Sequence, residues 1–249
     1  MYPKLFGVID SYTFMLVLGI VLAFVLAIIY IKYKKFNKND ILDLIICGAF
    51  AIAGGSIFAL GFQALYDFIE SPTTFVFEFK MTFYGGLFGG VLGFVLPYYL
   101  IIKKKTTLDI GAVLNIAPAC IALAHAIGRI GCFLTPCCYG KVSEYGMYFA
   151  AIDATVIPTQ LYEAIFLLIL TAVLIPLAFK NFKYNYVIYL GTYSIFRFII
   201  EFFRGDDRGF TFLGMSPSQL WSILILISLF PLILLVNKYV YGTNKSRKE

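Results

Sequence analysis

Charged residues are scarce in this chain. They make up 14% of its 249 residues, while hydrophobic residues make up 61%. Soluble domains typically carry about 25% charged and roughly 45–50% apolar residues. A soluble chain of this composition could not cover its core with polar surface. The composition therefore excludes an ordinary soluble domain and predicts an integral membrane protein.

Cysteine and histidine are also few, with five and one respectively. Cys47 and Cys120 lie in apolar runs, where we expect buried thiols, so the cysteines do not form a secreted disulfide framework. A cleavable signal peptide is not expected either, because the first apolar run is too long for one and ends in lysines.

The net charge is +6. A basic balance could indicate nucleic-acid binding, but the lysines of a membrane protein gather on its cytoplasmic loops. We therefore expect no nucleic-acid partner, and we expect no cofactor.

Seven apolar runs are each long enough to cross a bilayer as a helix, which takes about 20 residues. No soluble domain can be separated from them, so we predict one polytopic membrane domain over 1–249, all-α with seven transmembrane helices. Glycine pairs such as Gly54 and Gly55 would permit close helix approach, or could line a lipid-sized groove. The predicted spans are about 12–31, 41–66, 82–102, 108–134, 158–179, 185–203 and 217–237.

Lysines and arginines predict the orientation of these spans. One set of loops and the C-terminal tail hold thirteen of them, and the other set holds five. Cytoplasmic loops carry the excess of positive charge. We therefore expect the N-terminus outside and the C-terminus in the cytoplasm.

Two arginines, Arg129 and Arg197, lie inside apolar runs. A charged side chain at mid-bilayer costs about 2.5–3.5 kcal/mol on insertion scales, so each must pair, reach water or bind a ligand. Helical spacing places His125 and Cys132 on the same face as Arg129. A polar stripe on the sixth span consists of Tyr193, Arg197, Glu201 and Arg204.

Two explanations of these arginines remain open. Arg197 could pair with Glu201 one turn away, while Arg129 extends outward to the headgroup region. Alternatively, the guanidinium groups converge on a phosphate, which arginine grips with two parallel hydrogen bonds. The charge count favours the second, because Arg129 and Arg204 still need an anion and Glu163 is the only other good candidate. We therefore predict a lipid-phosphate site.

The segment AIGRIGCFLTPCCYG at 126–140 resembles the signature of bacterial prolipoprotein diacylglyceryl transferases, GRIGNF-x-N-x-E-x-x-G. Five further segments resemble that family's motifs in the family's order. They are SYTFMLVLG at 11–19, FYGGLFGG at 83–90, PTQLYE at 158–163, YSIFRFIIEFFR at 193–204 and MSPSQ at 215–219.

This resemblance implies a transferase of the bacterial cytoplasmic membrane with its active site toward the outer leaflet. Such an enzyme moves the diacylglyceryl group of phosphatidylglycerol onto the lipobox cysteine in the signal peptide of a preprolipoprotein. Glycerol-1-phosphate is released and a thioether remains. The implied partners are therefore phosphatidylglycerol, a preprolipoprotein and membrane lipid.

The same resemblance assigns roles to individual residues. Arg129 and Arg197 would hold the lipid phosphate and stabilise the charge on the leaving group, and Glu201 would orient Arg197. Tyr12 and Tyr193 would hydrogen-bond the headgroup. Three further substrate-binding candidates lie in the matching motifs: Cys132, Gly140 and Arg204.

Departures from the family's pattern include four positions of the site. Tyr84 stands where the family has the histidine of HGGL, and Cys132 where it has the signature asparagine. Cys137 replaces a glutamate and Ser56 an arginine. The proton acceptor for the attacking thiol is therefore not in its usual place.

Tyr84 and His125 are the two catalytic candidates for that proton transfer. Tyrosine is a poor base at neutral pH, with an unperturbed pKa near 10, unless arginines depress it. His125 lies one turn from Arg129 and could substitute for the missing histidine, although a lone histidine in a membrane helix is more often a packing residue.

Cys132, Cys137 and Cys138 allow several interpretations. They lack the paired C-x-x-C spacing and nearby histidines of zinc motifs, so we expect no metal site. A disulfide on the outer face or a covalent relay through one cysteine are alternatives. We favour a variant subgroup of the family whose site is packed differently.

Overall fold

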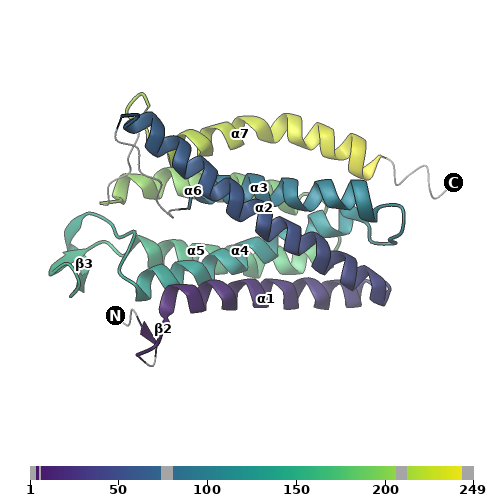
Figure 1. The fold of residues 1–249 in the computed structure, drawn as a ribbon, viewed down its shortest axis with the longest axis horizontal. Helices are drawn as coiled ribbons and strands as arrows, with labels where there is room; N and C mark the ends of the chain where they lie inside the picture. Colours follow the sequence, from purple (N-terminus) through teal and green to yellow (C-terminus); the bar gives the residue numbers. More distant parts are fainter. Residues whose placement is uncertain (1–3, 6, 74–80, 206–211, 243–249) are drawn as a thin grey trace. The chain divides into compact units, whose positions relative to one another are not determined.

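The computed structural model describes residues 4–5, 7–73, 81–205 and 212–242. Within this part of the chain, seven helices are long and apolar enough to cross a membrane (Figure 1). The predicted all-α fold with seven transmembrane helices is thereby confirmed. Several charges used to predict the orientation lie outside the described residues: Lys80, Arg208, Lys245, Arg247 and Lys248.

The helices begin and end close to the predicted spans. Three of them continue into short helices of different pitch: η1 (Tyr98–Ile102), η2 (Glu201–Phe203) and η3 (Asn237–Tyr241). The seven helices are α1 (Ser11–Tyr33), α2 (Lys38–Glu70), α3 (Phe83–Pro97), α4 (Ile110–Leu134), α5 (Thr159–Phe179), α6 (Asn185–Ile200) and α7 (Pro217–Val236).

Helix α2 exceeds its predicted span of 41–66 at both ends. At its start the backbone N–H of Asn37 donates to Asp40 Oδ2 at 2.8 Å, which stabilises a first turn of polar residues. At its other end Gln63 donates to Asp67 Oδ1 at 2.8 Å, one turn further on. Hydropathy alone does not detect these polar turns, because they carry no apolar run.

Two small antiparallel sheets, which the sequence did not indicate, lie outside the helices. Strands β1 (Lys4–Leu5) and β2 (Ile9–Asp10) pair directly before α1, and β3 (Val142–Phe149) and β4 (Ala154–Val156) pair between α4 and α5. Asp10 then accepts hydrogen bonds from the N–H and hydroxyl of Thr13 at 2.7 and 2.8 Å, which keep the pKa of its carboxyl below the usual range and begin α1.

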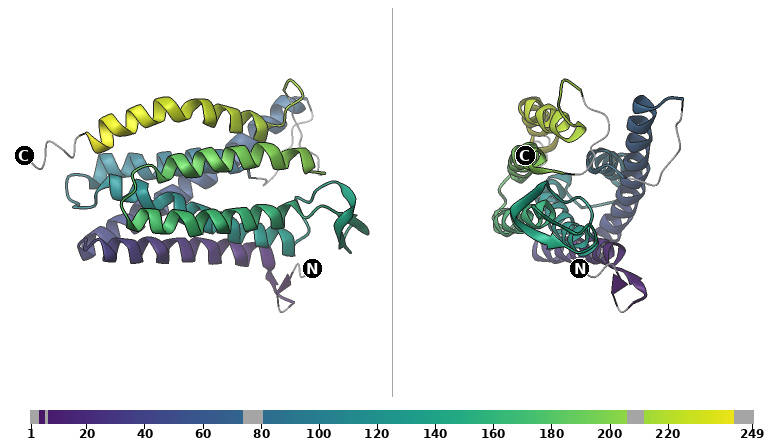
Figure 2. Two further views of the ribbon diagram at one scale, coloured as in Figure 1. Left: turned by 180° about the vertical axis from the view of Figure 1, so that it is seen from behind. Right: turned by 90° about the vertical axis from the view of Figure 1, so that its left-hand side faces the viewer.

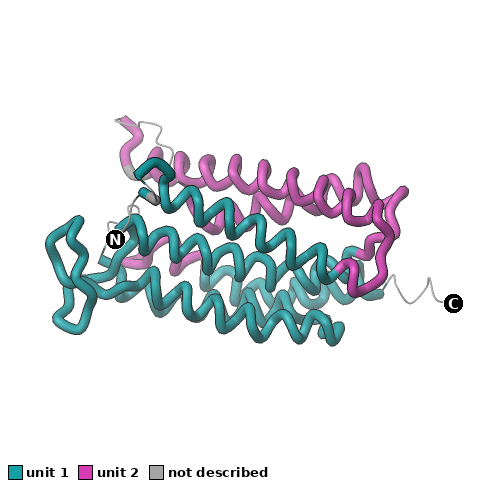
Figure 3. Tube along the Cα trace, turned by 90° about the horizontal axis from the view of Figure 1, so that it is seen from below, with its two compact units in different colours: residues 1–30, 110–207, 222–249 teal, residues 31–109, 208–221 magenta. Residues whose placement is uncertain are grey.

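The chain divides into two compact units (Figure 3). Unit 1 comprises residues 1–30, 110–207 and 222–249, and unit 2 comprises residues 31–109 and 208–221. Each unit therefore combines segments that are distant in sequence.

In unit 1, α4 packs against α5 and α6, and α1 runs beside it (Figure 2). The approach of α1 is close, because a Cβ on Gly19 would lie 2.8 Å from the carbonyl oxygen of Ala124. Buried amides join the helices further along, where Asn185 Nδ2 donates to the carbonyl of Asn115 at 3.0 Å and Asn115 Nδ2 to that of Ala178 at 3.1 Å. These contacts fix the helices that carry the polar residues described below.

In unit 2, α2 and α3 pack along their glycines. A Cβ on Gly54 would lie 2.7 Å from the carbonyl oxygen of Gly89 on the facing helix. Of the two alternatives for these glycines, the structure shows close helix approach.

The start of α2 is also tied to the loop that follows η1. Asp40, which is 1% exposed, accepts hydrogen bonds from the hydroxyls of Thr106 at 2.9 Å and Thr107 at 2.6 Å. A third comes from the backbone N–H of Thr107 at 3.0 Å. The buried carboxylate thus organises one end of this unit.

Candidate functional site

Glu163, near the start of α5, is the centre of a buried group of charged side chains in unit 1. It is 0% exposed. Arg129 of α4 places Nε 2.9 Å from Glu163 Oε2, and Arg197 of α6 places Nη1 3.9 Å from the same oxygen. Two arginines on different helices therefore converge on one carboxylate.

A second carboxylate completes what we call the arginine–glutamate network (Arg129, Glu163, Arg197 and Glu201). Glu201 of η2 holds Oε2 2.8 Å from Arg197 Nη2, one helical turn away. Arg197 is 4% and Glu201 7% exposed. The predicted pairing of Glu201 with Arg197 is confirmed, and α6 presents its polar stripe to the interior.

Two further polar side chains reach the other oxygen of Glu163. The hydroxyl of Tyr193 donates to Oε1 at 2.9 Å, and His125 Nε2 lies 3.5 Å from it. The rings of His125 and Tyr193 meet edge to face, with centroids 5.3 Å apart. Glu163 thus has partners from both α4 and α6, as a buried carboxylate requires.

Arg129 uses only part of its guanidinium group for this contact. Within the described chain its hydrogen-bonding or ion-pair partner is Glu163, reached through Nε, so its two Nη groups remain available. The side chain is 11% exposed. A guanidinium anchored at Nε and unengaged at Nη presents a fork of donors suited to a phosphate or carboxylate.

The first turn of α5 also fixes the loop that follows α4. The Thr159 hydroxyl donates to the carbonyl of Cys138 at 2.9 Å, and Gln160 Nε2 donates to that of Cys137 at 2.7 Å. Both donors are buried. Cys138 has a φ of +62°, a conformation that non-glycine residues rarely adopt and that these contacts maintain.

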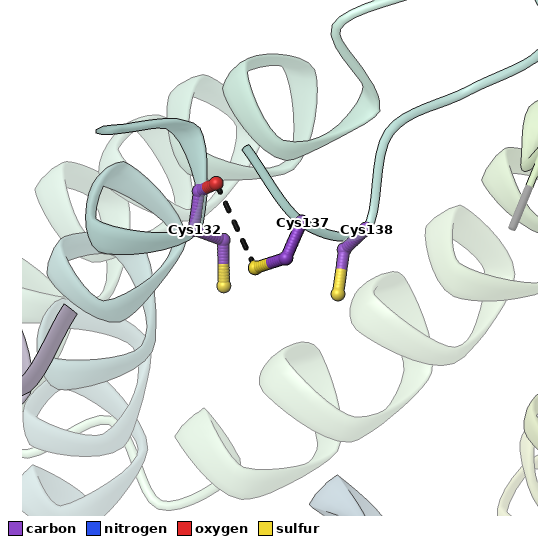
Figure 4. Close-up of side chains that lie close together, drawn as sticks. All are labelled: Cys132, Cys137 and Cys138. Carbon is purple, nitrogen blue, oxygen red and sulfur yellow. Dashed lines mark hydrogen bonds between the residues drawn. The ribbon is translucent and has the colours of Figure 1, made fainter. Parts of the chain in front are cut away.

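This loop brings three thiols together, which we call the cysteine cluster (Cys132, Cys137 and Cys138; Figure 4). Their three Sγ atoms lie within 4.8 Å of one another. The backbone N–H of Cys137 donates to the carbonyl of Cys132 at 3.4 Å, and its thiol donates to the same oxygen at 3.7 Å. The loop therefore folds back onto the last turn of α4.

The electrostatic surroundings of Cys138 favour its thiolate. Hydrogen bonds with Cys132 and Cys137, together with the positive charges of Arg204 and Arg129, hold the pKa of the Cys138 thiol well below its usual range. The cysteine cluster and the arginine–glutamate network are thus electrostatically linked through Arg129.

Backbone hydrogen bonds close the base of the β3–β4 hairpin. The N–H of Gly140 donates to the carbonyl of Ile157 at 2.8 Å, and that of Ile157 donates to Lys141 at 3.0 Å. The N–H of Lys141 then donates to the carbonyl of Phe203 at 2.9 Å, which joins the hairpin base to the end of η2. We call this arrangement the backbone ladder.

The structure brings together most of the residues predicted for the site. Tyr12 of α1 lies beside Gly131, within electrostatic range of Arg129 and the cysteine cluster. Gly140 has a packing role, because a Cβ there would lie 2.7 Å from the carbonyl oxygens of Ile157 and Phe203. Arg204 is buried and pairs with Gly140 in an isolated bridge.

Tyr84 and Ser56 belong to unit 2, so their surroundings are given separately from the site in unit 1. The ring of Tyr84 is buried and stacks on Trp221, with centroids 6.1 Å apart and an interplanar angle of 24°. Trp221 in turn donates from Nε1 to the hydroxyl of Tyr66 at 2.6 Å. Ser56 is half-buried on α2.

The site contains more than its sequence pattern indicates. The charge count named Glu163 as the one other candidate anion and favoured a lipid phosphate; the structure pairs Glu163 with Arg129, so a lipid phosphate is not required as its counterion. Thr159 and Gln160, which position the cysteine loop, carry no charge that would attract attention in the sequence. Their place in the first turn of α5, beside Glu163, was the available signal.

Comparisons with known proteins find relatives along nearly the whole chain. The family model for prolipoprotein diacylglyceryl transferase matches residues 4–235. A Clostridium tetani protein named phosphatidylglycerol–prolipoprotein diacylglyceryl transferase is 33% identical over 264 residues, covering 99% of this chain and 98% of that protein.

Two further relatives extend the match. A Clostridium perfringens protein named phosphatidylglycerol–prolipoprotein diacylglyceryl transferase 2 is 32% identical, and the match covers 90% of both chains. A Finegoldia magna protein named phosphatidylglycerol–prolipoprotein diacylglyceryl transferase is also 32% identical with 90% coverage of both. On these matches, this chain belongs to the prolipoprotein diacylglyceryl transferase family.

Proposed function

We propose that this membrane protein transfers the diacylglyceryl group of phosphatidylglycerol to the lipobox cysteine of a prolipoprotein, releasing glycerol-1-phosphate. The names of its relatives support both substrates. The family match over residues 4–235 supports the same class of reaction.

One observation carries the proposal most directly, namely the way Arg129 is held. Glu163 fixes its Nε at 2.9 Å, so the guanidinium is oriented before any lipid arrives. The two Nη groups can then grip the lipid phosphate with parallel hydrogen bonds. A group oriented in advance stabilises developing charge without the cost of reorganisation.

The reaction breaks the bond between the glyceryl carbon and a phosphate oxygen and forms a sulfur–carbon bond. Negative charge increases on the departing phosphate, where Arg129 stabilises it. Arg197 bridges Glu163 and Glu201 and keeps the carboxylates from repelling the phosphate. Tyr193 holds Glu163 from the opposite side at 2.9 Å.

The proposed location is the plasma membrane, with the N-terminus outside and the site toward the outer leaflet. The distribution of lysines and arginines supports this orientation. The chain crosses the membrane several times, because seven of its described helices are long and apolar enough to do so.

Complementation tests the proposed function. The chain is expressed in a bacterium depleted of its own diacylglyceryl transferase, and a reporter lipoprotein is analysed by mass spectrometry for the thioether-linked diacylglyceryl group. We expect modified lipoprotein with the wild-type chain and unmodified precursor with Arg197→Ala. Unmodified precursor despite good membrane expression of the wild type would contradict the proposal. It would favour a specialised relative with a different lipid donor or acceptor, or a catalytically silent protein that binds lipid or lipoprotein.

A further inference from the structure

The cysteine cluster is the feature that the proposed function leaves unused. Its three sulfur atoms come from the last turn of α4 and from the following loop, and they lie within 4.8 Å of one another. Among the described residues, no fourth cysteine, histidine, aspartate or glutamate joins this group. Three sulfurs thus converge on one point, and the described residues supply no fourth ligand of these types beside them.

We propose that the cysteine cluster binds one zinc ion, and that the open position of this zinc takes the lipobox thiol of the acceptor as a thiolate. The inference rests on the proposed function, since it names the group that activates the acceptor of that reaction.

The spacing of the sulfur atoms suits a metal better than a disulfide. Tetrahedral zinc with Zn–S bonds of about 2.3 Å holds its sulfurs about 3.8 Å apart. The observed limit of 4.8 Å is close to that separation. A disulfide requires about 2.05 Å between two sulfurs and would leave the third without a role.

The loop is built so that this arrangement persists. Thr159 and Gln160 bind the carbonyls of Cys138 and Cys137 from buried positions. Cys138 is held at a positive φ. A non-glycine residue stays in such a conformation only when surrounding contacts hold it there. Residues of this kind are common at functional sites.

The charges around the cluster fit a zinc–thiolate centre. Three thiolates and one zinc ion carry a net charge of −1. A fourth thiolate makes the net charge −2. Arg129 lies within electrostatic range of Cys132 and Cys138, and Arg204 within range of Cys138. These two guanidinium groups offset the negative charge without coordinating the metal.

The chemistry balances without an oxidant or reductant. On binding, the acceptor thiol releases its proton to water and forms a sulfur–zinc bond. The bound thiolate then attacks the glyceryl carbon, the carbon–oxygen bond breaks, and its electron pair leaves with the phosphate. The thioether product is neutral and a weaker ligand, so it dissociates from the zinc.

This centre would replace the base that the family's motif supplies at position 84. Tyr84 is buried beneath Trp221, where its ring is stacked, and tyrosine is a poor base at neutral pH. A metal lowers the pKa of a bound thiol and removes the need for a nearby base.

Metal analysis tests the inference on the full-length protein, purified in detergent with a reductant. Zinc content is measured by mass spectrometry for the wild type, Cys137→Ser, Cys138→Ser and, as a matched control on α4 outside the cluster, Cys120→Ala. We expect about one zinc per chain in the wild type and in Cys120→Ala, and loss of zinc in the other two. Wild-type protein without zinc, or serine variants that retain it, would overturn the proposal.

A spectroscopic experiment on the wild type remains informative even if the serine variants fail to fold. Cobalt replaces zinc, and a lipobox peptide is added. We expect the cysteine peptide to change the thiolate-to-cobalt absorption and a matched serine peptide to leave it unaltered. Identical spectra with both peptides would overturn the assignment of the open position. A disulfide within the cluster of active enzyme would overturn the metal site itself.

Thioether formation measured on the same preparations separates this inference from the proposed function. Zinc-free enzyme that still forms thioether would overturn the inference and leave the function intact. Zinc-loaded enzyme that responds to the cysteine peptide but forms no thioether would support the metal site and contradict the function.

Discussion

Glu163 contacts four other side chains of the site. Arg129, Arg197, His125 and Tyr193 all approach its two oxygens, from helices on either side. Its carboxylate therefore has a structural and an electrostatic role at once. Substitutions at this position should affect the stability of unit 1 as well as the reaction.

Glu163→Gln removes the negative charge while keeping the size of the side chain. Arg129 then loses its carboxylate partner, and breaking a buried ion pair costs about 3–5 kcal/mol. We expect a lower unfolding temperature and a lower yield in detergent, measured by fluorescence-detected size exclusion after heating.

Glu144→Gln is the matched control, because Glu144 is exposed on β3 and its loss of charge should have little effect. An unfolding temperature for Glu163→Gln equal to that of this control would show that the network does not contribute to stability as described.

Arg129→Lys keeps the positive charge of the side chain and removes the planar set of N–H donors, so it tests the role of those donors. A single ammonium group cannot hold Glu163 and grip the lipid phosphate with two parallel hydrogen bonds. Loss of one such donor to developing charge costs on the order of 100-fold in kcat. We expect a loss of this size in a thioether assay with phosphatidylglycerol and a lipobox peptide, and a rate equal to wild type would contradict the assigned role.

Candidate residues of the site could be identified from the sequence, but the contacts between residues on different helices could not. Helical spacing is enough to place Arg197 and Glu201 one turn apart, because both lie on one helix. The contact of Glu163 with Arg129 joins two helices, and periodicity within one helix carries no information about its neighbour. The convergence of the three thiols depends on the turn after α4, which hydropathy does not describe.

At the scale of elements, the glycines of α2 and α3 determine how closely these helices approach. Gly89→Ala would place a Cβ against the carbonyl oxygen of Gly54 and the side chain of Phe58. Overpacking of this kind costs about 1–3 kcal/mol. We expect a lower unfolding temperature, measured by scanning fluorimetry in detergent.

Gly61→Ala on α2 is the control for that substitution. Among the described residues nothing lies within 4 Å of a Cβ added there, and alanine is the better helix former. Its unfolding temperature should equal or exceed that of the wild type. Equal destabilisation by both substitutions would mean that helix packing is not the cause.

Hydropathy predicted the helices well because each must cover the apolar thickness of a membrane. The small strands were not predictable in the same way. Strands β1 and β2 are two residues long each, and their pairing depends on a turn with Gly7 at a φ of +74°. Such short pairs carry no periodic pattern of apolar residues.

At the scale of the whole molecule, the predicted orientation can be tested with single added cysteines. Tyr145→Cys lies in the β3–β4 hairpin, and Lys104→Cys lies in the basic loop after η1; both positions are exposed. A maleimide that does not cross membranes should label Tyr145→Cys in intact cells above the wild-type background. Lys104→Cys should be labelled only after the cells are opened, and the reverse pattern would contradict the orientation.

The backbone ladder has a practical consequence for the β3–β4 hairpin. Gly140, Lys141 and Ile157 close its base through peptide groups alone, with no side chain involved. Residues between the two strands, at 150–153, therefore contribute nothing to that closure. A short epitope or a binding peptide inserted there would be displayed at a fixed point of the protein, with the geometry of the neighbouring helices unchanged.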